Sequence, residues 1–148
     1  MPGVSGILET ALSVEDVEKS AAFYRRLFGL GTLLESERLI ALEVAGRDVL
    51  LLFKKGATSE PFATPGGVIP GHGTSGVHHF AFSIRSEDYA DWKGRLEAEG
   101  IVESEVSWPG GAKSLYFRDP DQNAVELITP GFWRFEGREG VSPACLLG

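Results

Sequence analysis

The sequence predicts an α+β fold made of two tandem βαβββ modules. Three observations predict it. The segment 9–14, ETALSV, returns 70 positions later as HFAFSI at 79–84. A stretch with the apolar spacing of an amphipathic helix follows each copy. Three strand-like runs then follow each helix. Because an internal repeat constrains the whole architecture, it outweighs the ambiguity of any single element.

The first copy opens with a strand over residues 9–14. Asp16 is the expected N-cap of the helix that follows, because its side chain can accept a hydrogen bond from a free backbone N–H of the first turn. Gly29 is the expected end of that helix, since glycine adopts the left-handed conformation that closes helices. Breaks at Glu37 and at the AGRD turn separate three expected strands, at 30–36, 38–44 and 48–53.

The second copy repeats this order from the strand at 79–84. Ser86 and Gly100 are the expected ends of its helix. Three strands are expected after it, at 101–108, 113–117 and 123–129. The segment RDPDQN predicts a turn before the last strand, in which Asp119 bonds nearby backbone groups and has a structural role. Gln122 of this turn would carry local strain if its φ is positive.

The expected organisation is a single domain over residues 1–148. Its parts are module one at about 7–54, a linking loop at 55–76, module two at 77–129 and a C-terminal tail at 130–148. The loop is rich in Gly, Pro, Ser and Thr, and it is longer than most connections in compact domains. A plain tether and an active-site lid are both open for it.

Composition narrows the class of protein. A net charge of −7 argues against nucleic acid, because phosphate binding relies on clustered Lys and Arg. No apolar run approaches the roughly 20 residues that span a bilayer. The N-terminus lacks the basic and apolar regions of a signal peptide. The single cysteine, Cys145, fits a reducing compartment. We therefore expect a cytoplasmic protein with neither nucleic-acid nor membrane partners.

The repeat also indicates chemistry. Side chains alternate along a strand, so His79 shares a face with Ala81, while His78 lies on the reverse face with Phe80. His79 is the residue that matches Glu9 across the repeat. In the last strand, Glu126 lies between apolar neighbours, where a buried carboxylate needs a partner to offset its desolvation. A structural, hydrogen-bonded role is the open alternative for a histidine in a strand.

Three phrases carry a family resemblance: LSVEDVEKSAAFYRRLFGL, HHFAFSI and LYFRDPDQNAVELITP. Together they resemble the vicinal oxygen chelate superfamily, which includes glyoxalase I, extradiol dioxygenases and the fosfomycin and bleomycin resistance proteins. The resemblance covers residues 7–129. It implies two modules whose curved, mixed sheets close around a cleft, with a divalent metal held by inward-facing strand residues.

The resemblance implies a ligand set position by position. The metal ligands would be Glu9, His79 and Glu126, with no ligand at Leu50, where the first module's last strand is expected to offer one. Two carboxylates and one imidazole make an oxygen-rich site that favours Mn²⁺, Fe²⁺, Ni²⁺ or Mg²⁺ acting as a Lewis acid. Zinc also accepts such ligands. The expected cofactor is thus a divalent metal ion, with Mn, Fe, Ni or Zn as the candidates.

The leading functional expectation is a glyoxalase-like lyase or isomerase acting on a small oxygenated substrate. The metal would stabilise an enediolate while a catalytic carboxylate, Glu126 or Glu9, moves a proton between adjacent carbons. Glu43 is a further candidate for the base. Leucine in place of a fourth ligand argues against true glyoxalase I activity.

Three alternatives stay open. An extradiol-type dioxygenase is disfavoured by the second carboxylate, because non-haem Fe(II) oxygenases use two histidines and one carboxylate. A fosfomycin-resistance-type enzyme would need a cationic pocket, for which the candidates are Lys113, Arg118 and Arg47. A metal-free binding protein of the bleomycin-resistance kind would use only the apolar cleft.

The remaining aromatic residues and the third histidine give weaker expectations. Trp108 and Tyr116 line the cleft or belong to the core. His72 in the loop is a solvated residue or a lid base. The tail carries aromatic side chains that need burial on this chain or on a partner, namely Phe132, Trp133 and Phe135. Relatives of this size imply a symmetric homodimer.

Overall fold

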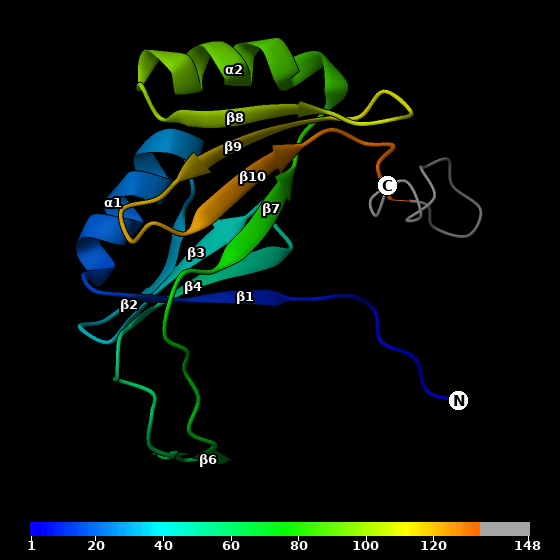
Figure 1. Cartoon of the computed structure of the whole chain (residues 1–148). Helices are drawn as coiled ribbons and strands as arrows, with labels where there is room; N and C mark the ends of the chain where they lie inside the picture. The colour runs from blue at the N-terminus through cyan, green and yellow to red at the C-terminus, as the bar shows by residue number, and fades with distance from the viewer. Residues whose placement is uncertain (134–148) are drawn as a thin grey trace. The chain divides into compact units, whose positions relative to one another are not determined.

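The computed structural model describes residues 1–133, and these confirm the α+β fold of two βαβββ modules (Figure 1). The chain divides into two compact units: the first unit, residues 1–76, and the second unit, which begins at Val77. Each unit contains one four-stranded mixed sheet. Two residues discussed above, Phe135 and Cys145, lie outside the described residues.

The first unit follows the predicted order of strand, helix and three strands. Its elements are β1 (Glu9–Val14), α1 (Val17–Phe28), β2 (Thr32–Glu35), β3 (Leu39–Val44) and β4 (Asp48–Lys54). The strands lie in the order β1-β4-β3-β2, so the first strand of the module lies beside the last. These two strands run parallel, and the other pairs are antiparallel.

One face of this sheet forms the core of the first unit. Alternate strand residues are buried there on the side of α1, and they are Leu12, Val14, Ile40, Leu42, Leu50 and Leu52. The helix begins as predicted, because the Asp16 side chain accepts a hydrogen bond from the Lys19 N–H at 2.9 Å. It ends as predicted at Gly29, whose φ of 69° is left-handed.

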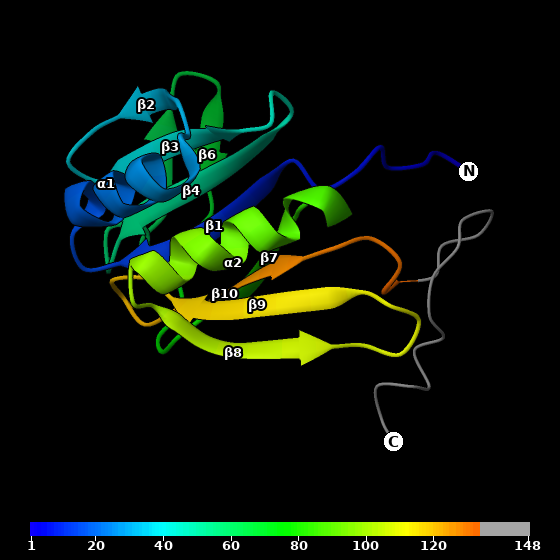
Figure 2. The ribbon, with the colours of Figure 1, turned by 90° about the horizontal axis from the view of Figure 1, so that it is seen from above.

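The second unit repeats the arrangement. Its elements are β7 (His79–Ser83), a 3₁₀ turn η1 (Ser86–Asp88), α2 (Tyr89–Ala98), β8 (Val102–Ser107), β9 (Lys113–Arg118) and β10 (Ala124–Ile128). Figure 2 shows the strand order β7-β10-β9-β8, with α2 running along one face of the sheet. The first and last strands are again parallel neighbours.

The start of the second helix differs from the prediction. Ser86 does not cap an α-helix, since it opens the 3₁₀ turn and the α-helix begins three residues later, at Tyr89. Arg85 holds this turn through a two-pronged ion pair with Asp88, with nitrogen–oxygen distances of 2.7 and 2.9 Å. An ion pair therefore orders the approach to α2 where the sequence suggested a serine cap.

The linking segment 55–76 is also more ordered than a plain tether. It contains a short hairpin formed by β5 (Phe62–Thr64) and β6 (Gly67–Ile69). On either side of this hairpin the chain is pinned to itself, because the His72 N–H donates to the Thr58 carbonyl at 2.7 Å. The Thr58 hydroxyl donates in return to the His72 carbonyl at 2.8 Å.

The turn before β10 is built around Asp119, which is 2% exposed. One carboxylate oxygen accepts hydrogen bonds from the backbone N–H groups of Asp121 and Asn123, at 2.9 and 2.8 Å. The other oxygen accepts from the Asn123 amide at 2.9 Å. This confirms the structural role of Asp119. Gln122 has a φ of 68°, which is the condition under which local strain is expected at this residue.

Within residues 1–133, no helix is long and apolar enough to cross a membrane.

Candidate functional site

The structure brings His79 and Glu126 together on the face of the second sheet that is turned away from α2. In the parallel pair, His79 lies opposite Ala124 and Ala81 lies opposite Glu126. The two functional side chains therefore point to the same side, and His79 Nε2 is 3.4 Å from Glu126 Oε2. The histidine side chain is 55% exposed and that of the glutamate only 8%. This pair combines an accessible imidazole with a shielded carboxylate.

The other ring nitrogen of His79 defines the tautomer. Nδ1 lies 3.1 Å from the Ala124 carbonyl oxygen. A carbonyl oxygen only accepts hydrogen bonds, so Nδ1 must carry the proton and donate it. In the neutral imidazole the lone pair is then on Nε2, which is the nitrogen that faces Glu126.

Glu126 is held by two further polar side chains. The Ser114 hydroxyl, which is fully buried, donates to Glu126 Oε1 at 2.5 Å. Tyr116 lies directly opposite Glu126 in the antiparallel pair of β9 and β10. Burial, the hydrogen bond to Glu126 and the negative charge of that carboxylate raise the pKa of Tyr116 to about 12. The phenol is therefore protonated near neutral pH.

The turn at Asp119 also helps to fix the position of His79 in the sheet. Asn123, which this turn orients, accepts a hydrogen bond from the His78 N–H at 2.9 Å through its side-chain oxygen. The Ala124 N–H donates to the His78 carbonyl at 2.8 Å. These bonds fix the register of β7 on β10 at the histidine. Period-two alternation predicts that the His78 side chain lies on the opposite face from Glu126.

The donor groups of the pair fit a divalent metal ion. A neutral Nε2 and a carboxylate oxygen both present lone pairs, and 3.4 Å is longer than a direct hydrogen bond. A cation bound by both atoms, or a proton on Nε2, would stabilise this arrangement. The second ring nitrogen of His79 donates to a backbone carbonyl, which is the common support of metal-binding histidines. Taken within each unit, residues 1–133 supply no cluster of three His, Cys, Asp or Glu side chains.

The third predicted ligand, Glu9, lies in the first unit, and its inclusion in one site with His79 and Glu126 stays a prediction. It is exposed at the start of β1, opposite Val49. No hydrogen bond or ion pair engages its carboxylate among the described residues. Glu43 also pairs with Val49, from the other side, so both glutamates lie on one face of the sheet.

The prediction for the first module's last strand was wrong by one residue. Leu50 is 2% exposed and packs on the α1 side of the sheet. The register equivalent of Glu126 is Leu51, because it lies opposite Ala11 as Glu126 lies opposite Ala81. Leucine offers no ligand at either position, so the expected absence of a donor in this strand is unchanged.

The three candidate cations for a phosphonate pocket are all engaged elsewhere. Lys113 alternates onto the α2 face, where its ammonium lies 5.2 Å from the ring centroid of Tyr89. Arg118 binds Glu103 with two nitrogens, at 2.6 and 3.0 Å. Arg47 contacts its neighbour Asp48 at 3.2 Å. Lys113 and Glu126 lie on opposite faces of one sheet, which argues against a cationic pocket that both residues line.

The first unit contains a separate cavity of about 420 Å³. Hydroxyl side chains and glycines of the linking segment line most of it, and the lining residues are Ser13, Gly56, Ser59, Gly71, His72, Gly73, Thr74 and Ser75. The His72 ring packs edge-on against Phe53, with centroids 5.0 Å apart. This volume falls in the range of small-molecule sites, although the cavity contains neither His79 nor Glu126.

Sequence reasoning missed Ser114 and Asn123. Both act on the His79–Glu126 pair by hydrogen bonds, Ser114 at the carboxylate and Asn123 at the backbone beside the histidine. Strand alternation offered a partial signal for the serine, because it puts Ser114 on the face of Tyr116. Nothing in the sequence pattern indicated which acceptor the serine would find.

Comparison with known proteins gives several relatives. Metallothiol transferase FosB of Staphylococcus haemolyticus is 30% identical over 128 residues, which are 85% of this chain and 84% of that protein. Catechol-2,3-dioxygenase of Bacillus subtilis is 27% identical over 117 residues, which are 78% of this chain but 38% of the dioxygenase. The crystal structure of lactoylglutathione lyase from Agrobacterium tumefaciens matches 90% of this chain and 100% of that chain, with a TM-score of 0.81 and 37% identity.

These relatives share one family and differ in reaction. The sequence model of the Glyoxalase/Bleomycin resistance protein/Dioxygenase superfamily matches residues 6–127, most of the chain. This confirms the resemblance drawn from the sequence phrases. The chain belongs to the Glyoxalase/Bleomycin resistance protein/Dioxygenase superfamily.

Proposed function

We propose that this protein is a metal-dependent, glyoxalase-like lyase or isomerase that acts on a small oxygenated molecule. The observation that carries the proposal is the pair of lone-pair donors, His79 Nε2 and Glu126 Oε2, which face each other 3.4 Å apart. The 37% identity to a lactoylglutathione lyase supports the reaction class. The specific substrate is part of the test.

In this proposal His79 and Glu126 hold a divalent ion, with Glu9 as the third ligand. Mn, Fe, Ni or Zn would supply a Lewis acid that polarises substrate oxygens. The two carboxylates have different roles. Glu126 has Ser114 and Tyr116 as donors, and they restrain it. Glu9 has no such restraint among the described residues, so it is the better carrier of a proton between adjacent substrate carbons.

A second candidate is thiol transfer to a small electrophile, since the FosB of Staphylococcus haemolyticus is 30% identical over most of both chains. The engaged cations argue against an anionic substrate such as a phosphonate. Arg118 is bound to Glu103, and Lys113 lies on the wrong face of the sheet. We therefore place the lyase or isomerase first.

The experiment is a measurement of bound metal by mass spectrometry on untagged protein purified without chelator. Near-stoichiometric Mn, Fe, Ni or Zn is expected in the wild type and in His78→Ala, which alters the neighbouring histidine on the reverse face. Little metal is expected in His79→Ala and Glu126→Ala. Light scattering on the same samples tests the homodimer that family resemblance predicts.

The loaded protein is then assayed in parallel on an α-ketoaldehyde with a thiol and on an epoxide with a thiol. Turnover of the first alone supports the lyase or isomerase, and turnover of the second alone supports thiol transfer. A wild type that takes up none of the four metals, even after reloading, would rule out a metal-dependent enzyme of either kind.

A further inference from the structure

A chain of hydrogen bonds runs from Trp108 to the candidate metal ligand. The indole N–H of Trp108 donates to the Ser114 hydroxyl oxygen at 2.8 Å. The same hydroxyl donates to Glu126 Oε1 at 2.5 Å. Ser114 is fully buried and Glu126 is 6% exposed, so water does not compete strongly for either bond. Trp108 directly follows β8, Ser114 lies in β9 and Glu126 lies in β10.

The chemistry of the groups gives this chain a direction. An indole N–H can only donate, and a serine hydroxyl has one proton to give. When Trp108 occupies a lone pair of the Ser114 oxygen, the hydroxyl proton is free to point at Glu126. Oε1 is thereby engaged, and Oε2 is the oxygen that faces His79 Nε2. The chain thus decides which carboxylate oxygen is presented to the histidine.

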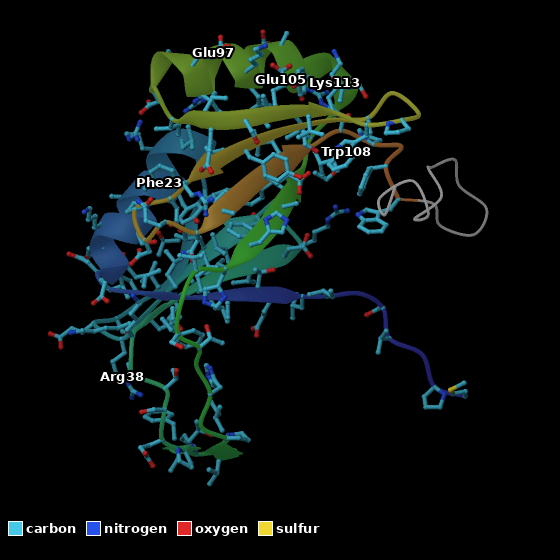
Figure 3. The ribbon with its side chains drawn as sticks, viewed as in Figure 1. Phe23, Arg38, Glu97, Glu105, Trp108 and Lys113 are labelled. Atoms are coloured by element: carbon cyan, nitrogen blue, oxygen red, sulfur yellow. The ribbon has the colours of Figure 1, made fainter. Side chains whose placement is uncertain are left out.

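Trp108 is itself held in place. Its backbone N–H donates to the Ala112 carbonyl at 2.8 Å, and its carbonyl accepts from the Gly111 N–H at 3.1 Å, closing the turn between β8 and β9. Its ring packs on Phe132, with centroids 4.6 Å apart, and Phe132 is 9% exposed. Figure 3 shows Trp108 at this end of the sheet, apart from Glu105 and Lys113, which lie toward α2.

We propose that Trp108 is a positioning residue for metal binding, which acts through Ser114 on the carboxylate of Glu126. The inference rests on the proposed metal-dependent function. It predicts that the indole N–H sets the affinity for the ion although the indole does not touch it. Partners one step removed from a metal ligand typically change affinity by about 10- to 100-fold when they are altered.

The test is calorimetric titration of the full chain with Mn²⁺. Trp108→Phe keeps an aromatic ring against Phe132 and removes the donor, so we expect Kd to rise about 10-fold. The matched control is Trp133→Phe, because Trp133 also packs on Phe132, at 4.9 Å, and its side chain is largely exposed. Its Kd should equal that of the wild type.

Non-additivity separates positioning from general weakening of the fold. Ser114→Ala should raise Kd by about 10- to 100-fold. If Trp108 acts through the serine, adding Trp108→Phe to Ser114→Ala should cause no further loss. Independent, multiplying effects would overturn the proposed route through Ser114.

A second readout needs no metal. In the ¹H–¹⁵N spectrum of the metal-free protein, Ser114→Ala should shift the Trp108 indole signal and speed its exchange with solvent, while the Trp133 signal stays in place. This measurement also serves if Trp108→Phe fails to fold. An unmoved Trp108 signal, or unchanged Mn²⁺ affinity in folded Trp108→Phe, overturns this inference alone. Failure of the wild type to bind any of the four metals overturns the proposed function and this inference together.

Discussion

Tyr116 shows how a single side chain at the site responds to its surroundings. The phenol lies opposite Glu126 across two antiparallel strands, and the burial and the nearby carboxylate raise its pKa to about 12. Both causes disfavour the phenolate, since it would be a second negative charge beside Glu126. Tyr116 is therefore suited to donate a hydrogen bond to the carboxylate over the whole physiological pH range.

This shift in pKa predicts a pH dependence of stability. Because the folded state binds the phenolic proton more tightly than the unfolded state, the stabilisation is fully present below about pH 10, the ordinary tyrosine value. It is lost as the pH rises toward about 12. Urea unfolding of the wild type and Tyr116→Phe should differ most at pH 9, and this difference should shrink by pH 11.5. A difference independent of pH would contradict the coupling to Glu126.

At the residue scale, strand alternation predicted which histidine faces Glu126, because it depends only on the period of two. The parallel register depends on long-range pairing, and there the prediction failed by one position, at Leu50. The hydrogen bonds of Ser114 could not be predicted from the sequence, because they also depend on long-range strand pairing. They require the hairpin of β8 and β9 to bring Trp108 to one side of the hydroxyl and β10 to bring Glu126 to the other.

At the scale of elements, α1 combines a good cap with one unfavourable group. Its N-cap Asp16 and its C-terminal Gly29 follow from local chemistry. Ser20, however, is fully buried on the helix face that packs on the sheet, and its hydroxyl has no hydrogen-bond partner among the described residues. A buried hydroxyl without a partner costs free energy, since it loses its bonds to water.

Ser20→Ala should therefore raise the free energy of unfolding by about 1 kcal/mol, from relief of desolvation and the higher helix propensity of alanine. Ser36→Ala is the matched control of opposite sign. The Ser36 hydroxyl donates to the Leu39 carbonyl and accepts from two backbone N–H groups, so its loss should cost about 0.5–1 kcal/mol. Urea unfolding measures both. A destabilising Ser20→Ala would mean that the hydroxyl has an unrecognised partner.

The elements that sequence reasoning missed share a cause. The 3₁₀ turn at Ser86 depends on the ion pair between Arg85 and Asp88, which competes with a serine cap. The hairpin of β5 and β6 is made from three-residue strands, too short for a periodic pattern to reveal. Long elements with repeated counterparts were predictable, and short elements stabilised by individual contacts were not.

For the whole molecule, metal binding should appear as stability. An ion that binds only the folded state stabilises it by about 2.7 kcal/mol when its free concentration is about 100 times Kd. Mn²⁺ should therefore raise the Tm of the wild type and of His78→Ala, and leave that of His79→Ala unchanged. Calorimetry of the three proteins with and without the ion measures this. Equal increases in all three would place the stabilising ion away from His79.

The overall architecture was predictable because the sequence contains two copies of the same βαβββ pattern. Each copy of the module supports the reading of the other, so errors at single boundaries did not change the order of elements. The candidate site was predictable only in part. His79 and Glu126 come from the two strands that pair in parallel, and the phrases around them are distinctive. Glu9 lies in the other copy, and its membership in the site depends on the proposed function.

The pairing of first and last strands also constrains the order in which the protein can form. β1 joins its sheet only through β4, and β7 joins its sheet only through β10. The paired residues are 40 positions apart in the first module (Glu9 and Val49) and 45 apart in the second (His79 and Ala124). Such distant pairing is slow compared with forming a helix or a hairpin. During synthesis on the ribosome the N-terminal part of the chain emerges first. The strand that carries His79 therefore cannot pair until the strand that carries Glu126 has been synthesised. The candidate site is thus completed only by the last strand of its own sheet, after the other three strands have been synthesised.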